Sequence, residues 1–163
     1  MLASAVVIGL AAGLLRGGRL SNLQDLRVSL WPVLLAAVLI RLLAGVAGEW
    51  AAGLYVAGFL GVVAVAIANW RLAGAPLIAI GAGLNLLVVA VNGAMPISLD
   101  AVAAVGGSIP RDPLHVELRP DSRLPFFADV VPVPLVRTAY SLGDLFLAVG
   151  GLWLSFRSVK PRP

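Results

Sequence analysis

The stretch that decides the fold is Thr138–Ser155, with the sequence TAYSLGDLFLAVGGLWLS. Its length and apolar character predict a membrane-spanning helix, yet it contains one acid, Asp144. Small and polar residues recur on one face at steps of three and four, and bulky apolar residues occupy the other. A helix in lipid turns its small face toward other helices, so Asp144 is expected to point into a helix bundle. An ionisable group in that position is costly and needs a partner.

The composition of the whole chain agrees with a membrane location. Of its 163 residues, 60% are hydrophobic and 12% are charged, whereas average soluble domains carry about 25% charged residues. A chain of this length forms a single domain and has too little polar surface to cover so much apolar surface in water. The net charge of +4 does not indicate nucleic-acid binding, because the basic residues are scattered and mostly follow apolar runs. With no Cys, one His and no nucleotide-binding or metal-binding motif, neither a cofactor nor a metal site is expected.

Four further apolar runs precede this stretch. They predict an all-α membrane protein with five transmembrane helices at about 2–15, 30–47, 51–68, 74–91 and 138–155. The first run is expected to be a retained helix rather than a removed signal peptide, because no positive segment precedes it and no cleavage site ends it.

The distribution of basic residues predicts the orientation of these spans. With the N-terminus outside and the C-terminus in the cytoplasm, the cytoplasmic segments hold Arg16, Arg19, Arg27, Arg71, Arg157, Lys160 and Arg162. The short outer loop between the second and third spans holds no basic residue, as the positive-inside rule requires. The expected location is therefore a bacterial plasma membrane, crossed several times.

An irregular extracytoplasmic segment, 92–137, separates the last two spans. Ser98 is placed to cap a short helix that extends to Val105, and Leu114–Leu118 alternates like a short strand. Leu124–Val136 is apolar but contains three prolines, so it cannot be helical throughout. We expect it to lie on the outer face of the bundle or to re-enter the bundle, where irregular backbone is tolerated if protein surrounds it.

Several short motifs resemble an uncharacterised bacterial family, a domain of unknown function found in small multi-span membrane proteins. They are Gly17–Leu20, Asn92–Ser98, Leu124–Asp129 with Pro132, and Ser141–Asp144. The family usually has a second glycine at the position of Ala94. The resemblance covers most of the chain and implies a multi-span membrane fold, but it implies no activity, substrate or cofactor.

Three polar groups on three predicted spans fall at similar depths. With a rise of ~1.5 Å per residue, Arg41 lies ~9 Å, Asp144 ~8 Å and Asn85 ~10 Å below the outer surface. We therefore expect Arg41 and Asp144 to pair, with Asn85 and Ser141 as hydrogen-bond partners, at the floor of a pocket that opens to the outside. The pair has two alternative explanations: a binding site, or a buried ion pair that only fixes helix register. Arg41 also has the length to extend to the outer interface.

Other polar residues are weaker candidates. Asn92 lies two turns from Asn85 on the same face, and Asp129 either caps a turn or reaches Arg41 or Arg137 as part of a lid. His115 is expected on a strand face without a catalytic role, because no nucleophile elbow accompanies it. The predicted ligand-binding residues are Arg41, Asn85, Asn92, Asp129, Ser141 and Asp144, and no catalytic residue is assigned.

The function predicted from these features is binding of a small polar or amphipathic ligand, or of a lipid, in a polar pocket in the outer half of the membrane. A role in transport is left open. Two alternatives also remain. The first is an accessory subunit of a larger membrane complex, which would use the glycine and alanine faces of the first and third spans for a membrane-protein partner or a second copy. The second is a membrane enzyme that acts on a lipid-linked substrate, with Asp144 or Asp129 as acid or base.

Overall fold

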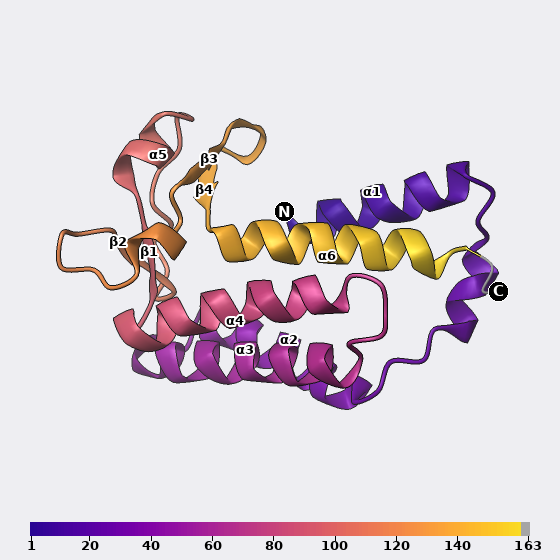
Figure 1. The fold of residues 1–163 in the computed structure, drawn as a ribbon. Coiled ribbons are helices and arrows are strands. Elements are labelled where there is room, and N and C mark those ends of the chain that lie inside the picture. The colour runs from indigo at the N-terminus through magenta and orange to yellow at the C-terminus, as the bar shows by residue number, and fades with distance from the viewer. Residues whose placement is uncertain (161–163) are drawn as a thin grey trace.

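The computed structural model describes residues 1–160, which are mostly helical. Its long helices are α1 (Leu2–Leu15), α2 (Trp31–Ala44), α3 (Ala51–Ala68), α4 (Ala75–Asn92) and α6 (Leu142–Ser158). They pack in the spatial order α1, α6, α4, α3, α2, so that helices distant in sequence, such as α1 and α6, lie side by side (Figure 1). Short 3₁₀ helices, Leu20–Asp25 and Gly48–Trp50, lie in the connections on either side of α2.

The predicted helical segments are confirmed to within a few residues. The bounds of α1 and α3 are the predicted ones, and α2 and α4 each begin one residue later than predicted. Within residues 1–160, two helices have the length and hydropathy to cross a membrane, Gly48–Ala68 and Ala75–Asn92. The helices α1 and α2 are apolar but shorter, at 14 residues each.

The start of the last long helix differs from the prediction. Thr138–Tyr140 is not helical but forms strand β4, which pairs antiparallel with β3 (Val131–Val133). The helix begins at Leu142 because Ser141 and Asp144 form a reciprocal capping box: the Asp144 backbone N–H donates to Ser141 Oγ at 3.0 Å, and the Ser141 N–H donates to Asp144 Oδ2 at 3.3 Å. Asp144 therefore lies in the first turn of α6, as its third residue, and not about five residues into the helix as the sequence predicts.

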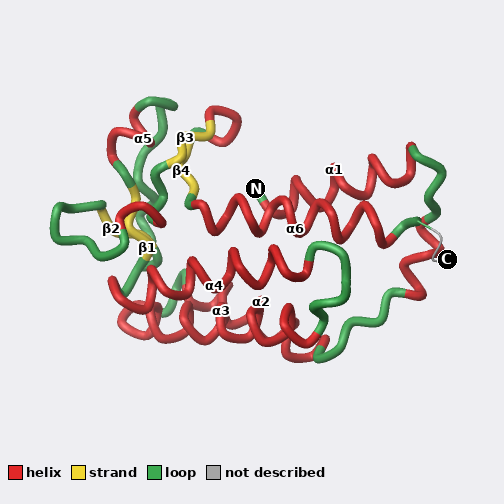
Figure 2. Tube along the Cα trace, viewed as in Figure 1, coloured by secondary structure: helices red, strands yellow, loops and turns green. Residues whose placement is uncertain are grey.

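The segment between α4 and α6 gathers at one end of the helices (Figure 2). Strand β1 (Met95–Ile97) pairs in parallel with β2 (His115–Glu117), and α5 (Leu99–Ala103) is capped by the Ser98 side chain, which accepts a hydrogen bond from the Ala101 N–H. The short helix and the strand expected here are thus confirmed. The fold is helical with four short strands among the described residues, rather than purely α.

The proline-rich run Leu124–Val136 lies over the end of the bundle and does not thread between the helices (Figure 2). It contains two 3₁₀ turns, Pro125–Phe127 and Pro134–Val136, because proline prevents a continuous helix. Phe127 packs against the main apolar core, whereas Phe126 and Leu135 are 81% and 92% exposed.

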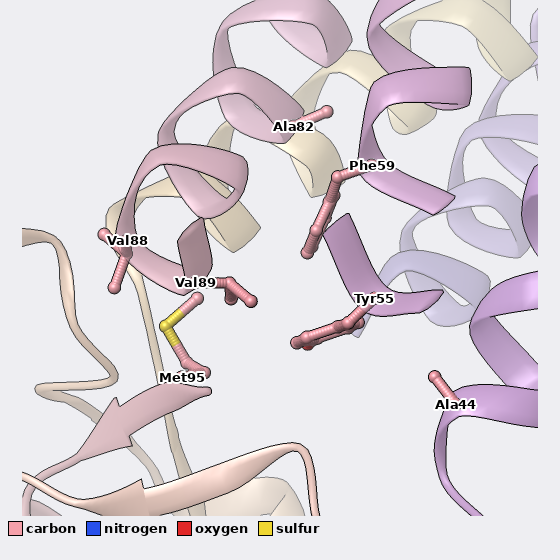
Figure 3. Packing of buried hydrophobic residues seen from close by; sticks show 7 residues of the cluster. All are labelled: Ala44, Tyr55, Phe59, Ala82, Val88, Val89 and Met95. Carbon is pink, nitrogen blue, oxygen red and sulfur yellow. The ribbon is translucent and has the colours of Figure 1, made fainter. Parts of the chain in front are cut away.

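The main apolar core ties this end segment to the bundle. It joins Ala44 of α2, Tyr55 and Phe59 of α3, Ala82, Val88 and Val89 of α4, and Met95 of β1 (Figure 3). In Figure 3 the Met95 side chain points from β1 toward Val88 and Val89 at the end of α4. Burial of these side chains fixes β1 over the ends of α3 and α4. With β1 it positions the segment 93–141 between α4 and α6, hereafter the outer segment.

Helices α4 and α6 approach closely at two pairs of glycines. Gly81 of α4 faces Gly143 in the first turn of α6, and Gly74 faces Gly150 one heptad further along the antiparallel pair. A Cβ atom at any of these positions would overlap backbone atoms of the facing helix. The absence of side chains at these glycines lets the two backbones approach and brings Asn85 of α4 against the first turn of α6.

Candidate functional site

A buried polar trio joins α4 to the start of α6, as the sequence predicts. The Asn85 Nδ2 group donates to Asp144 Oδ1 at 3.1 Å. Ser141 Oγ lies 2.9 Å from both Asn85 Oδ1 and Asp144 Oδ2, and its single proton serves one of them at a time. Asn85 is 2% exposed and Ser141 is fully buried. The Asp144 carboxylate is therefore held by an amide, a hydroxyl and a helix N-terminus.

Arg41 reaches the same region from α2 but does not pair directly with Asp144. No ion pair joins these two side chains within 4.0 Å in the part of the chain that the structure describes. The guanidinium instead stacks on α3, with Cζ 4.4 Å from the ring centre of Tyr55 and 4.7 Å from that of Phe59. The predicted pair is corrected because α2 packs against α3 rather than α6, and the aromatic faces attract the cation. Arg41 Nη1 is buried and has no hydrogen-bond partner among residues 1–160.

Two cavities meet at Arg41, Tyr140 and Asp144, which line both of them. The larger has a volume of about 430 Å³, and its walls are mainly apolar side chains: Leu2, Val38, Leu42, Phe59, Val62 and Leu147. The smaller, of about 220 Å³, lies under the outer segment and is lined by polar groups as well, namely Tyr55, His115, Asp129 and Thr138. An apolar chamber thus adjoins a polar one, with Arg41 at the junction.

Asp129 enters the smaller cavity from the outer segment. Its backbone is fixed at the edge of β1, where Asp129 N donates to Pro96 O at 2.9 Å and Asp129 O accepts from Ser98 N at 3.0 Å. Its side chain is 6% exposed, and Oδ1 has no hydrogen-bond partner in the described chain. Burial, reinforced by the negative charge of Asp144, raises the pKa of Asp129 to about 8, so its carboxyl is protonated at neutral pH.

The side chain of Asp129 does not cap the turn after Phe127, which was one of the two roles considered from the sequence. The hydrogen bonds that fix Asp129 belong to its backbone, and its carboxyl lines the smaller cavity together with Arg41. The other role, in which Asp129 reaches Arg41 or Arg137, is met only in that Asp129 and Arg41 line one cavity, since no ion pair within 4.0 Å joins Asp129 to either arginine among the described residues.

His115 also lines the smaller cavity, whereas the sequence predicted only that it lies on a strand face. Its Nδ1 lies 2.8 Å from Asp112 Oδ1, and its Nε2 faces Asp129 Oδ2 at 4.0 Å. Burial opposes ionisation of Asp112, but hydrogen bonds from His115 and from the Leu114 N–H outweigh it and lower the pKa of Asp112. An ionised carboxylate only accepts hydrogen bonds, so His115 Nδ1 carries a proton. The signal in the sequence was an acid three residues before a histidine, across the proline turn Asp112-Pro113.

Asn92 does not belong to this site. Its Nδ2 donates to Val88 O and to Arg123 O, both at 2.9 Å, and its Oδ1 accepts from Arg123 N at 2.8 Å. As the last residue of α4, it holds the loop between Arg119 and Arg123 at the surface. Asn92 lies two helical turns from Asn85, and its hydrogen bonds to the surface loop keep its side chain out of the site for which the sequence predicted it.

The small-residue faces of two helices have different surroundings. On α1, Gly9 and Gly13 pack against α6, where added Cβ atoms would overlap Ser155 and Val159. On α3, Gly53 and Ala57 are exposed. The small-residue face of α1 is therefore covered by α6 of the same chain, and of the two faces predicted to bind a partner protein only that of α3 has exposed residues of this set.

These features define a helical protein in which the segment between α4 and α6 covers a divided cavity, with Arg41 lining both of its parts. A family model described as a family of unknown function (DUF5317) matches residues 22–156, so the chain belongs to this family. The match includes every residue of the polar trio, Arg41, His115 and Asp129. No curated protein and no solved structure matches the chain. Within residues 1–160 no group of three His, Cys, Asp or Glu side chains is arranged to hold a metal ion.

Proposed function

We propose that the protein is a five-span integral protein of a bacterial plasma membrane. The support is the outward-facing surface of the long helices. Each carries at least one large apolar side chain that is more than half exposed: Ile8 58%, Leu43 59%, Leu60 53%, Leu87 56% and Val149 55%. Such side chains on every helix suit acyl chains better than water. The 14-residue helices α1 and α2 span only ~21 Å, and local thinning of the bilayer accommodates such short spans.

The orientation we propose has the N-terminus outside and the C-terminus in the cytoplasm. The connections that carry Arg19 and Arg71, and the last turn of α6 with Arg157, lie at the end of the bundle opposite the segment between α4 and α6 (Figure 1). The positive-inside rule assigns the basic end to the cytoplasm. The divided cavity is then in the outer half of the membrane, under the extracytoplasmic segment.

The biochemical role that we propose is binding of an amphipathic molecule or lipid in this divided cavity. The observation that carries the proposal is the unsatisfied Arg41 Nη1 at the floor of a largely apolar chamber. A buried guanidinium N–H group without an acceptor is unfavourable, and a ligand whose polar end accepts its hydrogen bond removes that cost. The apolar walls formed by Leu2, Val38 and Leu42 would hold the hydrophobic part. Transport of the ligand is one use of such a site.

The test is the amount of native lipid retained by the purified protein, measured by native mass spectrometry. Wild type is expected to retain a lipid in a fixed ratio, and Arg41→Gln to lose it by about tenfold or more, because a charged hydrogen bond contributes about 1.5–3 kcal/mol. Arg71→Gln is the matched control, since Arg71 is exposed at the opposite end. Equal retention by all three proteins would rule out this site.

A second candidate is an enzyme that acts on a lipid-linked substrate. It is favoured by the placement of His115, held by the ionised Asp112, opposite the protonated Asp129 in the smaller cavity. A histidine and a neutral carboxyl at one cavity are suited to general base and general acid roles. Incubation with extracted bacterial lipids distinguishes the two candidates. An enzyme yields new products that disappear in His115→Asn, whereas a binding protein yields none.

A further inference from the structure

The smaller cavity is lined by two residues with a buried polar atom that has no hydrogen-bond partner in the described chain, Arg41 (Nη1) and Asp129 (Oδ1). It shares Arg41, Tyr140 and Asp144 with the apolar chamber. We propose that it is a site for the anionic headgroup, a phosphate or carboxylate, of the amphipathic ligand, and that this group binds together with a proton carried by Asp129. The inference rests on the proposed binding function and adds the charge of the ligand and its dependence on pH.

Arg41 supplies the positive charge of the site. Its neighbour Asp144 is already engaged by Asn85 and Ser141, and its charge lies at the N-terminus of α6, where the helix dipole stabilises it. Arg41 stacks on the rings of Tyr55 and Phe59, and its Nη1 has no acceptor among residues 1–160. An anion placed at the junction of the cavities would give Arg41 the acceptor and counter-charge that the protein does not provide.

Asp129 supplies a neutral donor on the other side of the cavity. Its side chain is more than nine-tenths buried, its Oδ1 has no partner within residues 1–160, and it lines the same cavity as Arg41. A protonated carboxyl donates a hydrogen bond to an anion, whereas an ionised one repels it. The charged and titratable groups that face this cavity are Arg41, Tyr55, His115, Tyr140 and Asp144, and Asp112 stands behind His115.

The direction of the pH effect follows from these charges. The pKa of Asp129 is about 8, so below that pH the cavity offers a guanidinium and a neutral acid. As pH rises through this value, Asp129 becomes a second carboxylate beside Asp144 and opposes the anion. Affinity is therefore highest at neutral and acidic pH and decreases as pH rises, and binding of the anion raises the pKa of Asp129 further by linkage.

The test uses the full-length protein in neutral detergent and calorimetric titration with three probes: short-chain phosphatidylglycerol, short-chain phosphatidylcholine and inorganic phosphate. Phosphatidylglycerol is a phosphodiester whose own charge is constant across this range, so a pH effect reports on the protein. We expect it to bind more tightly than phosphatidylcholine, and about tenfold more tightly well below pH 8 than well above it. Asp129→Asn, a neutral mimic of the acid, should bind it equally at both pH values, and Arg41→Gln should lose the preference over phosphatidylcholine.

Each alternative result has a defined meaning. Competition by inorganic phosphate identifies a site for the free anion, and its failure to compete while phosphatidylglycerol binds identifies a lipid headgroup site. Equal affinity of wild type for the two lipids overturns the anion site while leaving amphiphile binding intact. A pH dependence that persists in Asp129→Asn, with the variant folded by size exclusion and thermal melting, overturns the role of the proton. Binding of neither lipid overturns the proposed function itself.

Discussion

Asn85 is the residue that connects the bundle to the start of α6. Its amide group satisfies both Asp144 and Ser141, and all three groups are removed from bulk water to a large extent. An apolar side chain in its place leaves a carboxylate oxygen and a hydroxyl with fewer partners in a low-dielectric setting.

We predict that Asn85→Leu lowers the free energy of unfolding by about 2–4 kcal/mol, because unsatisfied buried polar groups cost about 1–3 kcal/mol each. Thermal unfolding in micelles, followed by circular dichroism, measures the effect. Asn92→Leu is the control, since its bonds hold only a surface loop, and we expect a loss of about 1 kcal/mol or less. An Asn85→Leu protein as stable as wild type would contradict the role of the trio.

Asp129 makes the stability depend on pH in a defined direction. Its pKa is about 8 in the folded protein and about 3.9 in the unfolded chain. Burial of the neutral acid thus contributes stability that is fully present below the unfolded pKa and is lost as pH rises through the folded pKa.

We predict that Asp129→Asn gains stability relative to wild type as pH rises from about 4 to about 8, with no further gain above that range. Midpoints of thermal unfolding across this range measure the difference. Asp112→Asn should differ from wild type by a constant amount over this range, because the pKa of Asp112 is lowered and its stabilising contribution is lost only in more acidic solution. A constant difference between Asp129→Asn and wild type would show that the carboxyl is ionised in the folded state.

At this scale the sequence predicts part of the site. The trio was predictable because Asn85 and Asp144 each interrupt an apolar helix near the same end. The stacking of Arg41 on Tyr55 and Phe59 was not, since it depends on which helix α2 packs against. His115 was missed because its partner in the cavity, Asp129, comes from a separate turn of the outer segment.

At the scale of elements, the α4–α6 crossing determines whether the site forms. Gly81 and Gly143 allow the two backbones to approach at the level of Asn85, and a Cβ at Gly143 would overlap the Asn85 amide. The same glycines explain how a short polar side chain on α4 reaches the capping box of α6.

We predict that Gly143→Ala separates α4 from α6, breaks the hydrogen bond between Asn85 and Asp144, and destabilises the protein by about 1–3 kcal/mol, as overpacking typically does. Gly83→Ala on α4 is the matched control, because an added Cβ there meets nothing within 4 Å. Alanine at position 83 should be neutral or stabilise by up to about 1 kcal/mol, since alanine favours helix more than glycine. Thermal unfolding compares the two, and equal effects would contradict the close crossing.

The elements were largely predictable from the periodicity and length of apolar runs, and the main error was the start of α6. The sequence Ser141-Leu142-Gly143-Asp144 has the spacing of a capping box, which predicts a helix start at Leu142. The apolar character of Thr138–Tyr140 obscured it, because a buried strand and a helix end share that composition. Pairing with β3, which precedes it in the chain by the four residues 134–137, selects the strand.

At the scale of the whole molecule, the outer segment and the basic connections lie at opposite ends of the bundle (Figure 1). The basic connections and the cavity under the outer segment thus lie at opposite ends, which is the arrangement that the proposed orientation requires. The division of the cavity could not be predicted from the sequence. It depends on helix packing: α2 packs on α3 and α6 packs on α1 and α4, so residues of α2 and α6 line the larger cavity between them.

The absence of native cysteine makes the topology directly testable. We predict that Ser108→Cys, exposed in the outer segment, reacts with a membrane-impermeant maleimide in intact cells after removal of any outer membrane. Ser21→Cys, exposed in the connection between α1 and α2, should react only after the plasma membrane is permeabilised. The wild-type chain is the background control. Labelling of Ser21→Cys in intact cells, with Ser108→Cys protected, would place the cavity on the cytoplasmic side.

The central claim is that the divided cavity binds the polar end of an amphipathic molecule at Arg41. The measurement that tests it most directly is an experimental structure of the protein purified with its native lipids. We predict elongated density in the apolar chamber, with an acceptor atom within hydrogen-bond distance of Arg41 Nη1. A chamber without density, together with a direct ion pair between Arg41 and Asp144, would contradict the claim and leave the polar cluster with a purely structural role.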